Sequence, residues 1–500
     1  MLEFGEFLPD QAKYANSGAT NAKNCLPLTN RSYGPLPALT SVVDALSNRV
    51  QGAASLQQAS GAQFTFCGDN QNLFKLGTTA FAEISKSTNA YTTASDDRWN
   101  ILQYGDRVVA LNGHTDAPQS YLMGTSSDFA DLAGSPPYAK HQGVVNNFVM
   151  FGNIKQGSDV VPNRVHWCAI NNPTDWPTIG SADAASKQSD RQDLPTGLAV
   201  MAITGAVGGA DGAVFMRESI YRVSYEGAPL VFSFTEVERG RGTLAGASVI
   251  NVGPFAFFLA EQGFFVFDGS QSTSIGSQKV DKFFFDDLDF NFIDRITGAA
   301  DPKAKLVWWS YAGQNNRSGV PNKLIIYNWE TQRWSYGEVE VQLIFNDTSV
   351  GYNLDQLNPF GNLETIETSF DDRFWVGGFA SLSAFSQTNR LSTFSSSPME
   401  AILTTTEFGG MELFKKPNER LYVNGIRPHV DGGVSTVSLN YRDTPQALIS
   451  TDGPSVVDSN GVAHFTRSCR YARATVTIAA GGTWSHAQGV DMDVAEDGES

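Results

Sequence analysis

The stretch FFLAEQGFFVFDGSQSTSIG, residues 257–276, places seven large apolar side chains around one polar break. Both apolar runs are rich in phenylalanine, and Gly263 lies between them, which predicts two β-strands joined by a tight turn. The polar turn DGSQS and another short segment follow. The longest apolar run, Val252–Phe267, is broken at 261–263 and is too short for a membrane-spanning helix. This stretch therefore predicts a β-hairpin of a globular protein.

The same signature recurs along the chain. An apolar strand, a turn of Gly, Asn or Asp and a second apolar strand occur in seven segments between about Thr40 and Ser395, at spacings from roughly 40 residues upward. Besides the hairpin above, these segments begin at Phe64, Arg107, Asn147, Ala213, Lys305 and Arg373. A radial arrangement buries both faces of such units and exposes only short edges, so the pattern predicts an all-β fold, a β-propeller of six or seven blades. Unrelated hairpins in β-sandwiches are the alternative.

The residue pattern of the sequence changes on either side of this region. The alternation in RATVTIA (473–479) predicts a separate β-sandwich after about Pro398. Residues 24–42 hold four Leu and three Pro without periodicity, which indicates an extended arm. We therefore expect an N-terminal arm at 1–40, a propeller at 41–395, a β-sandwich at 396–490 and an acidic tail at 491–500. Two short helices are expected, at Ser41–Val50 and Phe283–Ile296.

Charge and cysteine content limit the function. The chain has 35 Lys and Arg, 52 Asp and Glu, and a net charge of -17, without the clustered basic residues that binding to phosphates requires. Its four cysteines are scattered without a CxxC pair, so we expect buried free thiols rather than a zinc site or a disulfide framework. The start lacks a basic segment followed by an apolar one, so we expect a chain made and kept in a cytoplasm.

Motifs for catalysis are missing. The chain contains no GxSxG, HExxH or GxxxxGK[ST] motif and no GxGxxG that precedes a helix, so we expect no enzyme, no catalytic residue and no cofactor. The six histidines never pair at i, i+2 or i, i+4 spacing, so no metal site is expected from them. Carboxylates from different blades could still converge for glycoside hydrolysis, which spacing alone does not test.

Three groups of residues are candidates for contacts. The acids Asp281, Asp286, Asp287, Asp289 and Asp294 could hold calcium but lack the glycine of an EF-hand loop, so a solvated polar face is favoured.

The second group is ERGRGTLAG, in which Arg239 and Arg241 could bind a partner's carboxylate. A mobile loop whose arginines pair with local acids is the favoured interpretation of this segment. The third is the pair Trp308 and Trp309, of which at most one is expected at the surface, because adjacent strand residues face opposite ways.

Several segments together resemble a known family. They are WNILQYGDRVVALNG (99–113), SDFADLAGSPPYAKH (127–141), NRVHWCAINNPTDW (163–176), FTEVERGRGTLAG (234–246), KVDKFFFDDLD (279–289), LIIYNWETQRWS (324–335) and RYARATVTIAAGGTWSHAQGVDMDV (470–494). They resemble tail proteins of short-tailed bacteriophages and related prophages, over most of the chain from about Trp99 onward. The shared motifs are structural and have no catalytic content.

The resemblance implies the hub, or nozzle, of a short phage tail. Such a subunit forms a ring, expected here to be a homohexamer, below the portal and its adaptor. It carries tail fibres or spikes and lets the genome leave without specific DNA binding. The expected location is the virion, after assembly in the host cytoplasm. A glycan-binding or glycan-hydrolysing propeller of the tail is the alternative.

An acidic wall would repel phosphate, so Asp286, Asp287 and Asp289, together with Asp491 and Asp493, are candidates for the lumen or its rim. Arg239 and Arg241 are candidates for a partner-contact loop. The long insertions 180–195 and 351–367 are expected to reach a neighbouring subunit.

Overall fold

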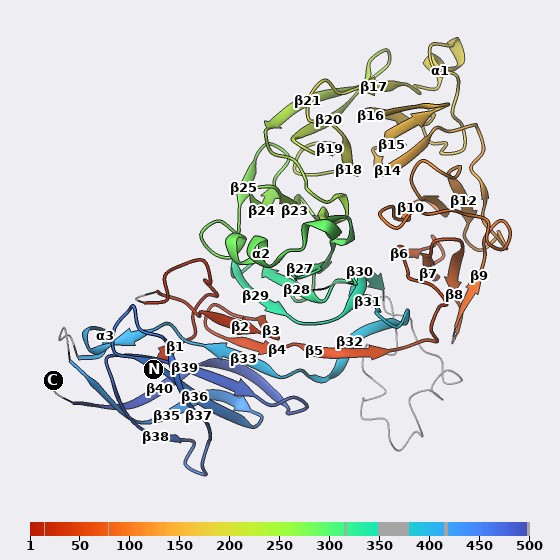
Figure 1. Ribbon diagram of the computed structural model, residues 1–500. Coiled ribbons are helices and arrows are strands. Elements are labelled where there is room, and N and C mark those ends of the chain that lie inside the picture. Colours follow the sequence, from red (N-terminus) through yellow and green to blue (C-terminus); the bar gives the residue numbers. More distant parts are fainter. Residues whose placement is uncertain are drawn as a thin grey trace.

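A computed structural model describes residues 1–497 except 15, 79, 315, 317, 349–379 and 415–418. Strands make up 53% of the chain and helices 5%, which confirms the all-β prediction. Seven four-stranded antiparallel blades surround one axis, six of them separate sheets and one part of a larger sheet, and a β-sandwich lies beside the ring (Figure 1).

Each sheet is one blade of the propeller. Blade 1 is β6 (Gly52–Gln57), β7 (Gln63–Gly68), β8 (Leu73–Leu76) and β9 (Phe81–Glu83). Blade 2 is β10 (Asn100–Tyr104), β11 (Arg107–Leu111), β12 (Gln119–Leu122) and β13 (Ala130–Asp131). Blade 3 is β14 (Tyr138–Val145), β15 (Phe148–Gln156), β16 (Asp159–Trp167) and β17 (Arg191–Asp193). Blade 4 is β18 (Val200–Thr204), β19 (Gly212–Met216), β20 (Ser219–Gly227) and β21 (Val231–Arg239).

The remaining three blades complete the ring. Blade 5 is β22 (Ile250–Val252), β23 (Phe255–Ala260), β24 (Gly263–Phe267) and β25 (Ser272–Ser274). Blade 6 is β26 (Thr297–Asp301), β27 (Leu306–Tyr311), β28 (Lys323–Asn328) and β29 (Arg333–Gly337). Blade 7 is β30 (Val341–Thr348), β31 (Ala380–Ser386), β32 (Leu391–Pro398) and β5 (Pro37–Ser41).

The ring is closed by a strand from the start of the chain. The first strands of the blades line the axis, and β30 of blade 7 packs against β6 of blade 1. Blade 7 takes its fourth strand from the N-terminal segment, since β5 pairs antiparallel with β32, Ser41 opposite Ser392. The described residues thus form a seven-bladed propeller.

The predicted hairpins correspond to the second and third strands of the blades. The opening hairpin is β23 and β24, with Phe258 opposite Phe265. On one face, Phe258 packs against Phe215 of blade 4 at 5.2 Å between ring centroids, and on the other Phe264 packs against Trp309 of blade 6 at 4.8 Å. The phenylalanines therefore divide between the two flanking blades, as predicted. The segment predicted from Arg373 begins outside the described residues.

The β-sandwich joins strands from both ends of the chain. One sheet has the order β3 (Cys25–Pro27), β4 (Tyr33–Pro35), β40 (Trp484–Glu496), β35 (Leu421–Gly432) and β38 (Ala463–Cys469), with β1 (Leu2–Glu3) also paired to β40. The other has the order β2 (Asn21–Lys23), β33 (Ala401–Thr404), β39 (Tyr471–Ile478), β36 (Ser435–Arg442) and β37 (Ser450–Val456), with β34 (Phe408–Gly409) beside β39. Strand β40 runs through residues 491–496, which the sequence placed in an acidic tail.

The second sheet of the sandwich continues into the propeller. Strand β2 pairs with β33 on one side and, at Lys23 and Tyr336, with β29 of blade 6 on the other. Blade 6 and half of the sandwich are consequently one ten-stranded sheet. Residues 1–40, expected as an extended arm, contribute strands to both parts.

Helices are short and few in the described part of the chain. They are α1 (Ala182–Ser186), α2 (Asp281–Asp287), α3 (Gly410–Phe414) and the 3₁₀ turns η1 (Gly246–Ser248) and η2 (Phe290–Arg295). The prediction near Phe283–Ile296 is confirmed by α2 and η2. The helix predicted at Ser41–Val50 is wrong, because Val43, Leu46 and Val50 instead bury their side chains in an irregular segment against blades 7 and 1. Among these elements no helix has the length and apolar character that crossing a bilayer demands.

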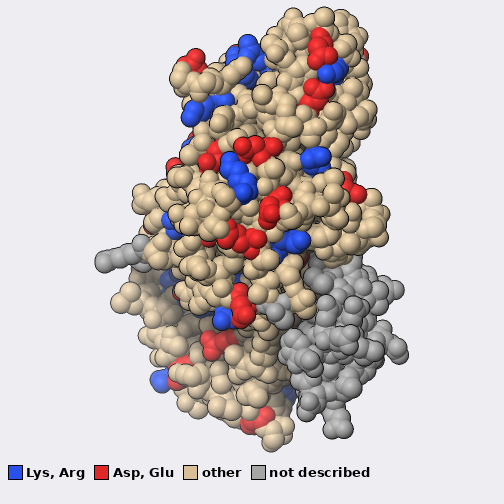
Figure 2. Space-filling model, turned by 90° about the vertical axis from the view of Figure 1, so that its right-hand side faces the viewer, with Lys and Arg blue, Asp and Glu red and all other residues tan. Residues whose placement is uncertain are grey.

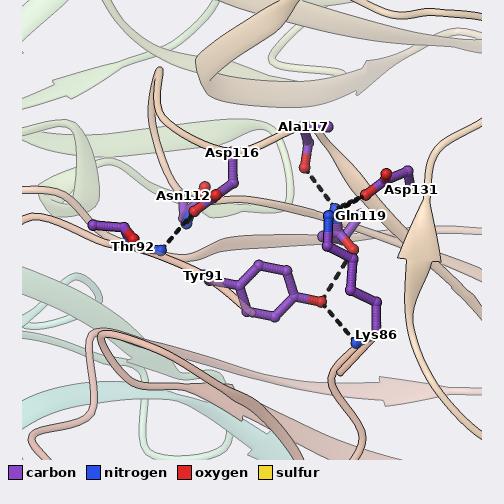
Figure 3. A network of polar contacts seen from close by, with 8 residues as sticks. All are labelled: Lys86, Tyr91, Thr92, Asn112, Asp116, Ala117, Gln119 and Asp131. Atoms are coloured by element: carbon purple, nitrogen blue, oxygen red, sulfur yellow. Dashed lines mark hydrogen bonds and ion pairs between the residues drawn. The ribbon is translucent and has the colours of Figure 1, made fainter. Parts of the chain in front are cut away.

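A polar network joins blades 1 and 2 (Figure 3). The buried Tyr91 hydroxyl, on the segment after β9, donates to Gln119 Oε1 at 3.0 Å. Gln119 Nε2 in turn donates to Asp131 at 2.7 Å, and Lys86 Nζ reaches the same carboxylate at 2.8 Å. Satisfying these polar groups fixes the segment that connects the two blades.

Candidate functional site

One hollow at which predicted site residues gather lies between the N-terminal segment, α2 and blade 6. We call it the α2 groove; its volume is about 400 Å³, and its lining residues are Pro9, Asp10, Lys282, Phe283, Asp286, Asp287, Lys323, Tyr336 and Glu338. Two of the predicted acids, Asp286 and Asp287, therefore lie at one site.

The N-terminal segment builds one wall of the groove. The Asp10 carboxylate accepts hydrogen bonds from the backbone N–H groups of Lys282 at 2.8 Å and Phe283 at 2.7 Å, at the first turn of α2. An acceptor at this position satisfies backbone donors that have no partner within the helix. The ring of Phe283 packs edge-on against Phe7 at 5.4 Å and so holds the segment on the propeller.

Every predicted acid in the groove has a basic partner. Lys282 pairs with Asp286 four residues on, and Lys323 of β28 pairs with Asp287 at 2.8 Å. The Tyr311 hydroxyl donates to Asp287 at 3.1 Å, and burial followed by that carboxylate raises the pKa of Tyr311. Glu338 pairs with Lys23, and Asp10 is held by backbone N–H groups, so the chemistry of the groove is that of a hydrogen-bonding surface. Within the described residues no three His, Cys, Asp or Glu side chains are grouped to hold a metal ion.

The other acids of the predicted cluster lie elsewhere. Asp289 begins η2, where its carboxylate accepts from the Asn291 N–H at 3.0 Å. Asp281 is buried beside β24 and accepts from the Phe264 N–H at 3.1 Å, and burial raises its pKa to about 6. Asp294 faces the propeller axis. The three acids outside the groove, Asp281, Asp289 and Asp294, thus lie at three different places.

Arg239 and Arg241 pair with nearby acids, as the favoured interpretation predicted. Arg239, at the end of β21, forms an ion pair with Glu236 at 2.6 Å. Arg241 approaches Glu238 at 3.4 Å and lies over the ring of Phe265 at 4.5 Å. Neither meets the α2 groove, and their contact with a partner stays a prediction.

Both tryptophans of the predicted pair are buried. Trp308 and Trp309 have 3% and 0% exposure, because Trp308 packs against Phe394 of blade 7 while Trp309 faces blade 5. At most one of them was expected at the surface, and the structure places neither there.

The insertion 180–195 is part of blade 3, since it forms α1 and β17 and buries Ala184 and Leu194. Its removal would take away a blade strand, so a variant without it would not keep an intact propeller. The insertion 351–367 lies outside the described residues.

Sequence inspection missed a group of arginines at the axis. Arg49, Arg98 and Arg295 each lie two or three residues before the first strand of a blade, β6, β10 and β26 respectively. The Arg98 side chain of blade 2 donates to the carbonyl oxygen of Ile296 at the start of blade 6, at 3.2 Å. Arg98 therefore spans this end of the axis. An arginine just before an inner strand is the signal that could have identified the group.

The comparisons with known proteins identify no family. No family model matches the chain, and no curated protein matches it. Among solved structures, the extracellular domain of a candidate one-component system of B. thetaiotaomicron aligns over 83% of this chain and 48% of its own, with 9% identity and a TM-score of 0.42.

Two further solved structures are similar. The WD40 domain of Neurospora crassa Pan2 aligns over 73% and 96% of the two chains, with 8% identity and a TM-score of 0.37. Apo AztD of Citrobacter koseri aligns over 62% and 94%, with 12% identity and a TM-score of 0.31. The chain spans about half the length of the B. thetaiotaomicron domain. None of these likenesses bears on function.

Proposed function

We propose that this chain is a structural virion protein, the ring-forming hub or nozzle subunit of a short bacteriophage tail. In this proposal copies of the chain assemble as a homohexamer below the portal and adaptor, carry tail fibres or spikes, and surround the path of the leaving genome. The chain is not an enzyme and needs no cofactor. The segments between residues 99 and 494 that resemble tail proteins motivate the family, and the following features of the fold support the mechanical role.

The observation that carries the proposal is the continuity between the two parts of the molecule. Blade 6 and the sandwich share one ten-stranded sheet, and β5 from the same N-terminal segment closes blade 7. A hinge between two domains needs a connection with few contacts crossing it, whereas here β2 joins both sheets, with a backbone hydrogen bond from Asn24 to Tyr336 at 2.7 Å, and β5 of the same segment pairs with β32. A rigid body of this kind suits a subunit that must keep its shape while DNA moves past.

The genome would leave through the hole of the ring and not along the axis of one propeller. Arg98 spans one end of that axis, and the hollow beside it takes about one water molecule. The lumen is accordingly a surface shared between subunits.

Charge on the visible outer side is mixed. Figure 2 shows acids and bases interspersed over the side that carries the outer strands of blades 1 and 2. Because Asp286 and Asp287 are paired with lysines, an acidic lumen would need other carboxylates among the 52 of the chain. We propose that the excess negative charge of the ring as a whole, -17 for each subunit, prevents DNA from settling on its wall.

Two measurements test the proposal together. Mass photometry and negative-stain electron microscopy of the purified chain, alone and with its portal and adaptor, should reveal rings with a central hole. Proteomics of purified particles of the encoding phage should find the chain in the tail. A chain that is absent from particles and stays monomeric with the adaptor, or that releases sugars from host-surface glycans, would contradict the proposed function.

A further inference from the structure

A small hollow lies at one end of the propeller axis, where blades 6, 7, 1 and 2 meet. We call it the axial pocket; its lining residues are Arg49, Val50, Gln51, Ser95, Asp97, Arg98, Asp294, Arg295, Gln342 and Leu343. Its volume is about 10 Å³, which is enough for one water molecule or one small ion. The ring closure brings these residues together from positions far apart in the sequence.

Three guanidinium groups converge on the axial pocket and have spare donors. Their hydrogen bonds go to backbone carbonyl oxygens, from Arg49 to Ser95 at 2.7 Å, from Arg98 to Ile296 at 3.2 Å and from Arg295 to Ser318 at 3.1 Å. Each guanidinium carries five N–H donors. The buried Nε of Arg295 has no hydrogen-bond partner among the described residues. Each guanidinium therefore keeps N–H donors beyond its one backbone hydrogen bond, and all three arginines line the pocket.

Positive charge exceeds negative charge at the axial pocket. Asp97 is engaged by Lys140 at 2.6 Å, which leaves Asp294 and the neighbouring Asp96 as the carboxylates for three arginines. Burial, followed by the neighbouring Arg49, lowers the pKa of Arg98 to about 10. Burial raises the pKa of Asp294. Half-buried like charges of this kind are costly without an anion between them.

We propose that the axial pocket binds one monoatomic anion, for which chloride is the probe, between Arg49, Arg98 and Arg295. The anion accepts the spare N–H groups and offsets the excess positive charge of the three blades. The small volume selects against oxyanions such as phosphate and sulfate, which need several times the space. Occupancy would tie blades 1, 2 and 6 together at the axis, a property independent of the proposed tail function.

The direct test is ³⁵Cl NMR line broadening with the full chain, titrated with sodium chloride at ionic strength held constant with sodium gluconate. We expect saturable broadening that bromide reverses and phosphate does not. Crystals soaked in sodium bromide should show one anomalous peak among the three arginines. Broadening that phosphate removes as well as bromide does, or no broadening beyond that of the variant below, would overturn the proposal.

Two variants and a control separate binding from folding. Arg98→Gln should weaken chloride binding about tenfold or more, because one charged donor is lost. Asp294→Asn should strengthen it about tenfold, because the competing carboxylate is removed, and a merely structural role of the pocket predicts no such gain. Arg239→Gln, on an exposed arginine paired with Glu236, should leave chloride binding unchanged. If Arg98→Gln fails to fold, unchanged chloride affinity in Asp294→Asn alone refutes the site.

Discussion

Replacing Arg333 by Met should release the N-terminal segment from the propeller. Arg333, at the start of β29, is 4% exposed, and its guanidinium donates to the carbonyl oxygens of Gly5, Thr29 and Ser32. It also lies over the ring of Tyr33 at 4.3 Å. No carboxylate forms an ion pair with it in the described part of the chain. Arg333 therefore holds three separate points of the segment by backbone contacts.

The magnitude follows from these contacts. The three hydrogen bonds have a charged donor, and charge-assisted hydrogen bonds contribute about 1.5–3 kcal/mol each. The buried cation–π contact adds about 2 kcal/mol. Relief of the desolvation of a buried guanidinium offsets several kcal/mol of this sum. We expect a net loss of about 3 kcal/mol for opening of the segment, since Met retains the apolar packing but none of the donors.

Native-state proteolysis measures this local opening. Trypsin cleavage at Lys13 and Arg31, followed by mass spectrometry, should be about 100-fold faster in Arg333→Met, because the rate follows the population of the open segment. Arg333→Lys keeps the charge but not the planar fork and should be intermediate. Arg467→Met, on an arginine that pairs with Asp452 away from the segment, is the control. Cleavage of Arg333→Met within about twofold of the wild-type rate would refute the role of Arg333.

Three further predictions test other parts of the molecule. His166 is buried, and neither ring nitrogen has a hydrogen-bond partner in the part of the chain that the structure describes. Burial followed by Arg191 lowers its pKa to about 4, so its neutral form stabilises the fold. The free energy of unfolding should therefore fall by about 3 kcal/mol between pH 6.5 and pH 4, and calorimetry should find a shallower decline in His166→Phe; equal slopes would exclude this origin. Asp10→Ala removes the acceptor at the start of α2 and should destabilise it by about 1 kcal/mol, seen as faster amide exchange in α2, whereas Asp44→Ala should change nothing there. Burial raises the pKa of all four cysteine thiols, so Ellman's reagent should find four thiols in denaturant and react slowly with the native chain, and fewer than four would reveal a disulfide.

The sequence revealed the strands with the strongest side-chain patterns. Several second strands are buried on both faces, as β19 and β27 are throughout their length, and therefore appear as continuous apolar runs. The first and fourth strands escaped notice, because β10 is half-buried at every position and β13 is two exposed residues. Their local sequences carry neither alternation nor an apolar run.

The pairing of distant segments could not be predicted from local sequence. Strand β2 has three residues, and nothing in Asn21–Lys23 indicates partners near Tyr336 and Leu403. The same holds for the axial pocket, since Arg49, Arg98 and Arg295 become neighbours only through ring closure. The acids between residues 281 and 294 show the converse. They are close in the sequence but lie at separate places in the fold.

The strand that closes blade 7 has a consequence for synthesis on the ribosome. Ser41 and Ser392, neighbours in that blade, are separated by 351 residues. At about 5–20 residues per second, β5 leaves the ribosome roughly 20–70 s before its partner β32 exists. During that interval β5 and the edge of blade 1 stay unpaired in the nascent chain. Both are then open to pairing with strands of other nascent chains on the same polysome. Assembly of the subunit is therefore a post-translational event, committed only when nearly the whole chain has been made.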